Sequence, residues 1–237
     1  MRINIICPKC AQAAGGSAIF HVATIREDGL YTGRCPKGHD LLVATQTLRH
    51  EMLFEIAMNA IVDGYRREAI SSFAASVERF FEFSLRVLSK NRKVPEQIVD
   101  GAWKTVSRQS ERQLGAFVFL YVVTFGQQAH ILGDRMVQLR NDVIHRGLLP
   151  NQDQVLEFGA AAYEVIQMGM QKLRAECIDD VNAVLTEHVT EIAKKMGTDY
   201  PRSFQVTPTA LNVIEDISSG YTPFNRLLAV RGISVST

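Results

Sequence analysis

The spacing of apolar residues changes near residue 47. Up to that point the chain carries short β-prone runs, of which residues 18–25 alternate apolar and polar positions and residues 30–35 follow the Asp28-Gly29 dipeptide. An Asp-Gly pair between two β-prone runs is typical of a hairpin turn. Residues 1–47 are therefore expected to form short strands and turns, with a hairpin at Asp28-Gly29.

From residue 48 onward, apolar residues recur at three- and four-residue spacings, the period of amphipathic helices. The strongest pattern covers 65–90, where one broad apolar face contains several phenylalanines. The segment 114–125 is apolar nearly all round and predicts a helix at the centre of a bundle. The pattern predicts helices over 48–64, 65–90, 95–109, 114–125, 128–145 and 151–196, the last interrupted near Cys177.

The last 40 residues mix proline, threonine and serine with short apolar runs, and their one helical period covers 209–217. We expect an appendage there that a partner chain could order. The sequence thus predicts a mainly α protein in three parts: a small β region over 1–47, a helical bundle over 48–197 and a C-terminal appendage over 198–237.

Composition narrows the class of protein. The chain is 46% apolar and 22% charged with a formal net charge of +1, as in ordinary globular proteins. This near-neutral balance means that any contact with nucleic acid must be local. No apolar run is long enough to span a membrane, and the first ten residues lack the pattern of a secretory signal, so a cytoplasmic location is expected. Glycine-rich phosphate-binding motifs are absent from the sequence, which gives no support to an NTPase or a dinucleotide-dependent enzyme.

Three of the four cysteines lie near the N-terminus. Cys7 and Cys10 form a C-x-x-C pair, and Cys35 with His39 forms a C-x-x-x-H pair 25 residues later. Three thiolates and one imidazole make a closed tetrahedral ligand set, so we expect structural Zn²⁺ and a zinc ribbon. His21 is an alternative fourth ligand, and a redox pair at Cys7 and Cys10 is the alternative to a metal.

A second candidate site lies in residues 134–147, where Arg140, Asn141 and His145 form the pattern R-N-x-x-x-H before Gly147. Asn141 and His145 are four residues apart on one helical face, so the amide could orient the imidazole. The pattern R-x-x-x-x-H is weak alone, because Arg34 and His39 also match it.

A helix-rich chain with this motif near a helix end resembles the HEPN superfamily (higher eukaryotes and prokaryotes nucleotide-binding). The helix over 65–90 is similar to an early bundle helix of that family that often carries a glutamate, here Glu78. The resemblance covers about residues 48–196. It implies a homodimer or higher homo-oligomer that cleaves RNA without a metal, with His145 in acid–base catalysis, Arg140 stabilising the phosphorane and Asn141 supporting the site.

The same resemblance implies a setting in defence or toxin-type RNA cleavage, with a protein partner or inhibitor to restrain the activity. Arg135 and Arg146 are candidate contacts for the RNA backbone. Two alternatives stay open from the sequence. The bundle could bind RNA or a nucleotide without cleaving it while the ribbon recruits a partner, or the protein could be a zinc-stabilised adaptor.

Overall fold

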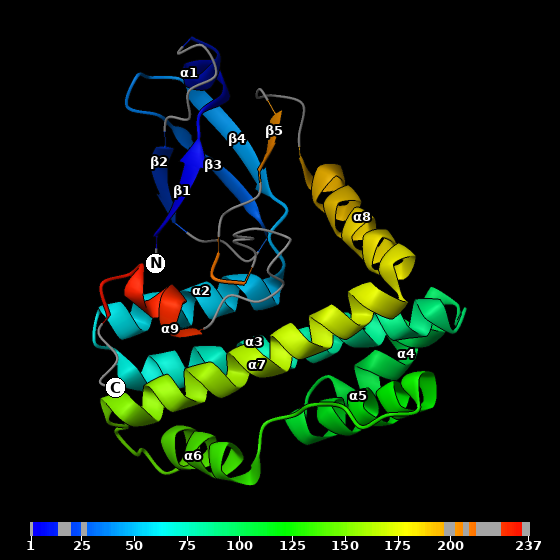
Figure 1. Cartoon of the computed structure of the whole chain (residues 1–237). Coiled ribbons are helices and arrows are strands. Elements are labelled where there is room, and N and C mark those ends of the chain that lie inside the picture. Colours follow the sequence, from blue (N-terminus) through cyan, green and yellow to red (C-terminus); the bar gives the residue numbers. More distant parts are fainter. Residues whose placement is uncertain are drawn as a thin grey trace. The chain divides into compact units, whose positions relative to one another are not determined.

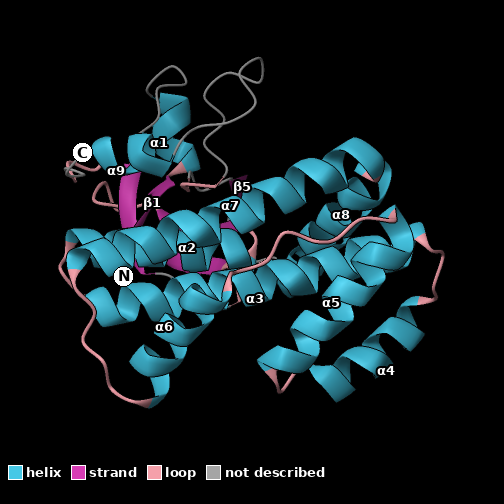
Figure 2. Ribbon diagram, turned by 60° about the horizontal axis from the view of Figure 1, so that its bottom comes forward, coloured by secondary structure: helices cyan, strands magenta, loops and turns pink. Residues whose placement is uncertain are grey.

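The computed structural model describes residues 2–13, 20–24, 28–196, 202–205, 209–211 and 224–233. The chain divides into two compact units, and each contains segments that are far apart in sequence. The N-terminal unit consists of Met1–Leu48 with Leu185–Pro208, and the helical unit consists of Arg49–Val184 with Thr209–Thr237. The protein is thus mainly helical with a small strand region at its N-terminus (Figures 1 and 2).

The N-terminal unit contains two small sheets. Strand β1 (Arg2–Ile6) pairs antiparallel with β2 (Phe20–Thr24), and the short helix α1 (Pro8–Ala13) lies between them in sequence. In the second sheet the central strand β4 (Asp40–Thr45) pairs antiparallel with β3 (Leu30–Arg34) and parallel with β5 (Arg202–Gln205). The sheet region is therefore completed by a strand about 160 residues further along the chain than β4.

The hairpin predicted at Asp28-Gly29 is wrong. A turn is present, with Gly29 at a φ of +70° and the Leu30 amide donating to Asp28 Oδ1 at 3.0 Å. However, β2 pairs with β1 and β3 pairs with β4, so the strands on either side of the turn belong to different sheets. The reason is that β2 pairs with the edge of β1 and β3 pairs with the edge of β4. The residues of the turn do not indicate either partner.

The two sheets of the N-terminal unit are joined by one side chain. Gln205 of β5 donates through Nε2 to the carbonyl of Ile6 at 2.6 Å and accepts from the amide of Ile6 at 2.8 Å. The apolar core of the unit is small and includes Leu42 and Ala44 from β4 with Ile192 and Met196 from the C-terminal segment. The end of α8 (Ile178–Lys195) thus contributes to this unit, although the sequence places it with the bundle.

The helical unit is arranged around α3. Its helices are α2 (Arg49–Val62), α3 (Arg66–Asn91), α4 (Glu96–Val106), α5 (Ser110–Phe125), α6 (Asp134–His145), α7 (Gln152–Glu176), the first part of α8 and the short α9 (Phe224–Ala229). Helix α3 packs against α2, α5, α6 and α7, and it runs alongside α7 in Figure 1. The predicted interruption near Cys177 separates α7 from α8.

Aromatic side chains form the centre of this unit. The rings of Phe54 and Phe73 meet edge to face at 4.8 Å, and Tyr163 and Phe224 lie on the same cluster. Gly159 makes room for them, because a Cβ at this position would lie 2.7 Å from Phe224 and 2.9 Å from Phe73. Phe224 anchors α9, a helix that the sequence analysis did not predict.

Helix α5 differs from its prediction as a central helix. It is helical as expected, but only Gln113, Phe117 and Tyr121 are buried, whereas Phe119 is 75% exposed and Val123 is 60% exposed. A sequence that is apolar all round does not indicate which face meets the core. In this unit α5 packs through one face on α3 and leaves apolar side chains of the other face exposed.

Two other predictions change with the structure. The helix expected over 128–145 begins only at Asp134, because Gly126 ends α5 in a left-handed conformation, residues 127–132 form no helix and Gly133 is extended. The expected appendage over 198–237 is not separate where it is described, since β5 belongs to one unit and α9 to the other. Most of the helical period expected over 209–217 lies outside the described residues. No described helix is both long and apolar enough to cross a membrane.

Candidate functional sites

The four predicted metal ligands meet in the N-terminal unit. The ligand atoms of Cys7, Cys10, Cys35 and His39 all lie within 4.8 Å of one another, and the three cysteines are buried and not disulfide-bonded. His39 faces the sulfurs through Nδ1, at 3.3 Å from Cys10 Sγ, 3.5 Å from Cys35 Sγ and 3.7 Å from Cys7 Sγ. These four residues could therefore hold a metal ion.

Each pair of ligands is positioned by a tight local structure. Cys7 follows β1 directly, and Cys10 lies one turn further within α1. Cys35 and His39 flank the turn between β3 and β4, which is closed by the Cys35 amide donating to the His39 carbonyl and the Gly38 amide donating to the Cys35 carbonyl. Gly38 adopts a φ of +82°, a conformation that glycine takes without strain. The strand pairing thus brings the second pair of ligands into one tight turn.

The thiols differ in how their surroundings affect ionisation. Burial, with hydrogen bonds to Cys7 and Cys35, raises the pKa of Cys10 to about 11. Burial alone would also raise the pKa of Cys35, but hydrogen bonds from the backbone amides of His39 and Lys37 lower it below its ordinary value. Amides that stabilise a thiolate are the arrangement expected of a metal-binding knuckle.

The spacing of the ligand atoms also fits a tetrahedral ion. Metal–sulfur and metal–nitrogen bonds of about 2.3 and 2.0 Å imply sulfur–sulfur separations of about 3.8 Å and sulfur–nitrogen separations of about 3.5 Å in a tetrahedron. Cys10 Sγ and Cys35 Sγ are 3.8 Å apart. His21, the alternative ligand, lies on β2 opposite Ile5. Its side chain lies outside the described residues.

The second site centres on Arg140 of α6, whose side chain is only 17% exposed. Its Nη2 donates to Glu78 Oε1 of α3 at 2.7 Å and to Ser110 Oγ of α5 at 3.1 Å, and its Nη1 donates to Asn141 Oδ1 at 2.9 Å. Three helices therefore hold one guanidinium group. Glu78, the glutamate on which the family resemblance partly rests, supplies the carboxylate.

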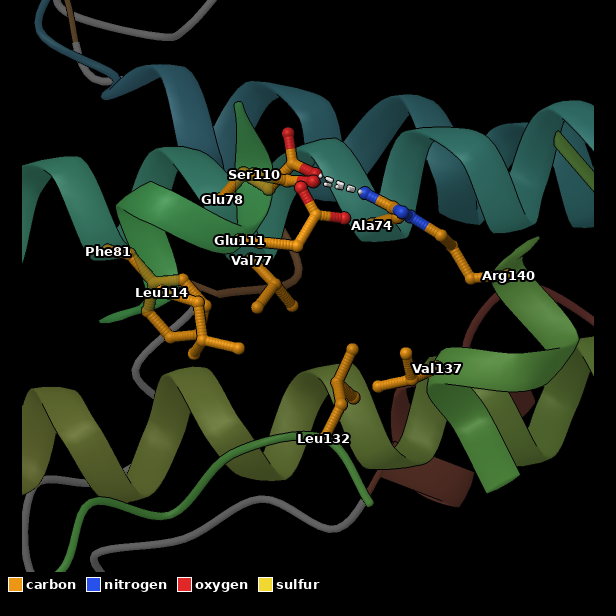
Figure 3. Close-up of a pocket in the computed structure, with 10 residues that line it drawn as sticks. All are labelled: Ala74, Val77, Glu78, Phe81, Ser110, Glu111, Leu114, Leu132, Val137 and Arg140. Atoms are coloured by element: carbon orange, nitrogen blue, oxygen red, sulfur yellow. Dashed lines mark hydrogen bonds and ion pairs between the residues drawn. The ribbon is translucent and has the colours of Figure 1, made fainter. Parts of the chain in front are cut away.

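A cavity of about 100 Å³ opens beside this guanidinium group (Figure 3). Polar side chains gather at one side of it, where Glu78, Ser110 and Glu111 lie near the end of the Arg140 side chain. The remaining lining is apolar and consists of Ala74, Val77, Phe81, Leu114, Leu132 and Val137. The site thus combines a charged edge with a hydrophobic wall.

His145 lies at the exposed end of α6, close enough to act on Glu111 electrostatically. The pKa of Glu111 is lowered first by its own backbone amide, then by a hydrogen bond from Ser110 and by the positive fields of Arg140 and His145. Glu111 is thus ionised near neutral pH. Its carboxylate thus lies within electrostatic range of both Arg140 and His145.

Asn141 has a different neighbour from the one expected. The four-residue spacing predicts that its amide orients His145, but its side-chain oxygen accepts from Arg140. Within the described part of the chain it has no hydrogen bond to His145. Arg135 and Arg146, the candidate RNA contacts, are exposed and form ion pairs with Glu157 and Asp142. Both arginines are therefore accessible, although each has an acidic neighbour.

Sequence reasoning missed Ser110 and Glu111. They begin α5, about 30 residues before the motif, and no spacing rule connects them to Arg140. The only local signal is an acidic residue in the first turn of a helix, which usually reflects helix capping. No family model, curated protein or solved structure matches this chain. The resemblance to the HEPN superfamily therefore rests on the residues themselves.

Proposed function

We propose that the protein is a metal-independent endoribonuclease of the HEPN type that works as a homodimer of its helical unit. In this proposal His145 exchanges a proton with the RNA 2′-hydroxyl or the leaving oxygen, and Arg140 stabilises the negative charge of the phosphorane. An imidazole titrates near neutral pH, as acid–base catalysis requires, and a guanidinium offers paired donors to phosphate oxygens. Asn141 supports the site through Arg140.

One observation carries this proposal: the arginine of the motif is fixed at the edge of an open cavity. Glu78, Ser110 and Asn141 occupy Nη1 and Nη2, which holds the planar group in one orientation. A guanidinium has five N–H donors, so Nε and a remaining Nη1 proton stay available for a phosphate. Such preorganisation lowers the cost of stabilising charge in the transition state.

The geometry of α6 supports a dimer. Arg140 and His145 are five positions apart, which places them roughly 140° apart around an ideal helix. A cleft shared by two copies would let both side chains face one substrate. The exposed Phe119 and Val123 of α5 are apolar surface of the kind that a second copy would cover.

For the N-terminal unit we propose a structural Zn²⁺ in a zinc ribbon. All four ligands come from the protein, which leaves no open position for water or substrate, and three sulfurs with one nitrogen favour zinc over harder ions. The metal would stabilise the fold of the N-terminal unit and take no part in cleavage. We place this activity in the cytoplasm, in defence or toxin-type RNA cleavage under the control of a partner or inhibitor.

The test is cleavage of total RNA and of tRNA by the purified protein in EDTA, with zinc content measured at the end. We expect products with 2′,3′-cyclic phosphate ends from the wild type, and a loss of at least roughly 100-fold in His145→Ala and Arg140→Ala. His130→Ala and Arg67→Ala, at a partly exposed histidine and an exposed arginine outside the site, are matched controls that should keep the activity. Equal cleavage by His145→Ala and the wild type would refute the catalytic assignment.

A non-catalytic module that binds RNA or a nucleotide is the second candidate, and one contact favours it. Glu78 lies 2.7 Å from Arg140 and offsets part of its charge, which weakens the stabilisation of a phosphorane more than the binding of a phosphate through the remaining donors. In that function the ribbon would recruit a partner. RNA binding that is lost in Arg140→Ala, with no cleavage by a folded wild type, would select this alternative.

A further inference from the structure

The cavity beside Arg140 has a size that suits one ring system. Its volume is about 100 Å³. Pockets for whole drug-sized ligands are usually about 300–1,000 Å³, so a complete nucleotide would not fit inside. A flat group of one or two rings would fit, with any attached sugar and phosphate left outside.

The walls favour a flat apolar face. The six apolar lining residues come from α3, α5, α6 and the loop before α6, and Phe81 among them is held by stacking on Phe117 at 4.5 Å between ring centroids. Nucleobases splayed out of single-stranded RNA are commonly bound between such side chains. The hydrophobic wall thus fits a base better than it fits a phosphate.

The polar side of the cavity presents hydrogen-bond acceptors to a ligand rather than donors. The donors that Arg140 directs at this edge are taken by Glu78 and Ser110. Glu111 is ionised, and among the described residues no cation bonds to its carboxylate. Its oxygens already accept from its own backbone amide and from Ser110, but a carboxylate has about four acceptor sites. The remaining sites, together with the second oxygen of Glu78, can therefore accept from a ligand that brings hydrogen-bond donors.

Among the four RNA bases, guanine matches this edge. Its Watson–Crick edge presents two adjacent donors, N1–H and the N2 amino group, which one carboxylate can accept in parallel. Adenine and cytosine each present one amino donor beside an acceptor nitrogen, and that acceptor would face the negative charge of Glu111. Uracil presents one N–H between two carbonyl oxygens, which the carboxylate would repel.

We infer that the cavity is a guanine-binding subsite, in which Glu111 reads the Watson–Crick edge of a base unpaired from RNA. The base would lie against the apolar wall, and its phosphate would lie toward Arg140 and His145. This inference rests on the proposed nuclease, because it names the nucleotide next to the cleaved bond. Glu111 is then the specificity-determining residue, and Glu78 is the positioning residue for Arg140.

The test measures binding without cleavage. The full-length wild type is titrated calorimetrically with 3′-GMP, 3′-AMP, 3′-CMP and 3′-UMP. We expect 3′-GMP to bind roughly tenfold or more tightly than the other three, as for a bidentate contact to a base edge. In Glu111→Gln the preference should fall below roughly threefold, because the amide has one acceptor and its NH₂ meets the guanine amino group.

Two further variants control for folding and for charge. Glu96→Gln changes an exposed acid in the first turn of α4, outside the cavity, and should keep the guanine preference. Val137→Trp alters a side chain that is 39% exposed, so it should fill the cavity without disturbing the core and abolish binding of all four nucleotides. Unchanged melting curves establish that both variants are folded.

The outcomes separate this inference from the nuclease itself. A guanine preference that depends on Glu111, in a protein that does not cleave RNA, supports the subsite and refutes the nuclease. RNA cleavage without a base preference, or a preference that survives in Glu111→Gln, overturns the subsite and leaves the nuclease standing.

Discussion

The two units of this protein differ in what fills their interiors. The helical unit has a continuous core in which the rings of Phe54, Phe73, Tyr163 and Phe224 meet. The N-terminal unit has short strands and an apolar cluster that includes Leu42, Ala44, Ile192 and Met196, and it also buries the three cysteines of the Cys/His cluster. Small domains with little apolar surface to bury commonly need a metal. The comparison teaches that one unit is built around a cluster of rings, whereas the other gathers four residues that could hold a metal ion.

Removing the proposed metal should have the largest effect, and this effect should be confined to the N-terminal unit. Metal binding in small zinc domains contributes about 10–16 kcal/mol, so Cys10→Ser or prolonged chelation should unfold the N-terminal unit. Hydrogen–deuterium exchange should show amides of β3 and β4 losing protection while those of α3 keep theirs. Cys177→Ala, a change at the buried cysteine outside the cluster, is the control. Protected β3 and β4 in a metal-free protein would contradict the comparison.

Truncating the aromatic core should instead destabilise the helical unit. Phe73→Ala removes a fully buried ring, and such changes lower the free energy of unfolding by about 3–5 kcal/mol. Urea unfolding followed by the fluorescence of Trp103, the only tryptophan in the chain, reports on the helical unit. Ile98→Ala, at a side chain of α4 that is 64% exposed, should change stability by less than about 0.5 kcal/mol. Equal effects of the two substitutions would show that the ring cluster is not the core.

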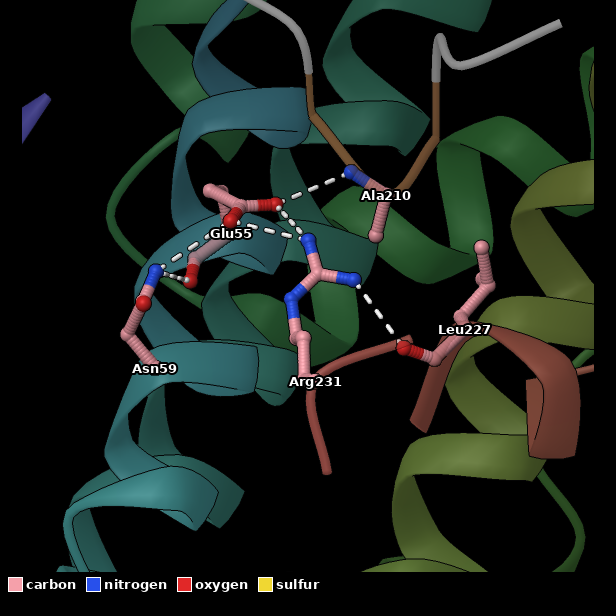
Figure 4. Close-up of polar contacts among 5 residues, drawn as sticks. All are labelled: Glu55, Asn59, Ala210, Leu227 and Arg231. Carbon is pink, nitrogen blue, oxygen red and sulfur yellow. Dashed lines mark hydrogen bonds and ion pairs between the residues drawn. The ribbon is translucent and has the colours of Figure 1, made fainter. Parts of the chain in front are cut away.

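A smaller effect is expected where the C-terminal segment joins the helical unit (Figure 4). Arg231 donates to both carboxylate oxygens of Glu55 at 2.9 and 2.8 Å and to the Leu227 carbonyl, while the Ala210 amide donates to Glu55 Oε2. Arg231→Ala should cost about 2–3 kcal/mol, because it leaves a carboxylate that is 13% exposed without its cation.

This loss should be local to the attached segment. Hydrogen–deuterium exchange of α9 should accelerate more than that of α3. Arg67→Ala, at an exposed arginine whose nearest acid is 4.0 Å away, is the control. Unchanged exchange of α9 in Arg231→Ala would show that Phe224 alone holds the helix.

The smallest effect is a pH dependence of the helical unit. Burial lowers the pKa of His50 to about 3, and its ring packs against Phe80 and Phe83. Since the unfolded state takes up a proton near pH 6.5 and the folded state does not, stability should fall as the pH drops below 6.5 and level off near 3. Between pH 7 and 5.5 the loss should be about 1 kcal/mol.

His50→Phe should remove this part of the pH dependence, because the replacement ring does not titrate. The measurement is urea unfolding at pH 7 and 5.5 with Trp103 fluorescence, with His130→Phe as a control at a partly exposed histidine. An equal pH dependence in wild type and His50→Phe would assign the effect to other groups.

The metal ligands and most helices could be predicted because their signals are local. The two residues of each pair, C-x-x-C and C-x-x-x-H, lie within a few residues of each other. The spacing of apolar residues in α3 likewise predicts which of its faces is buried. The choice of pairing partner for each strand has no such local signal. A dipeptide turn at Asp28-Gly29 gave no information on which partner each neighbouring strand would find.

The sequence by itself determined the mainly helical class, the break near Cys177, the four candidate ligands and the arginine of the motif. Tertiary structure decided which face of α5 is buried, that β5 completes a sheet with β4, and that α9 inserts Phe224 into the core. It also brought Ser110 and Glu111 to Arg140 and turned Asn141 toward the arginine. The physical reason is that helix periodicity and ligand spacing depend on residues that are close together in sequence. These contacts, in contrast, join side chains that are tens of residues apart and meet only when the elements pack.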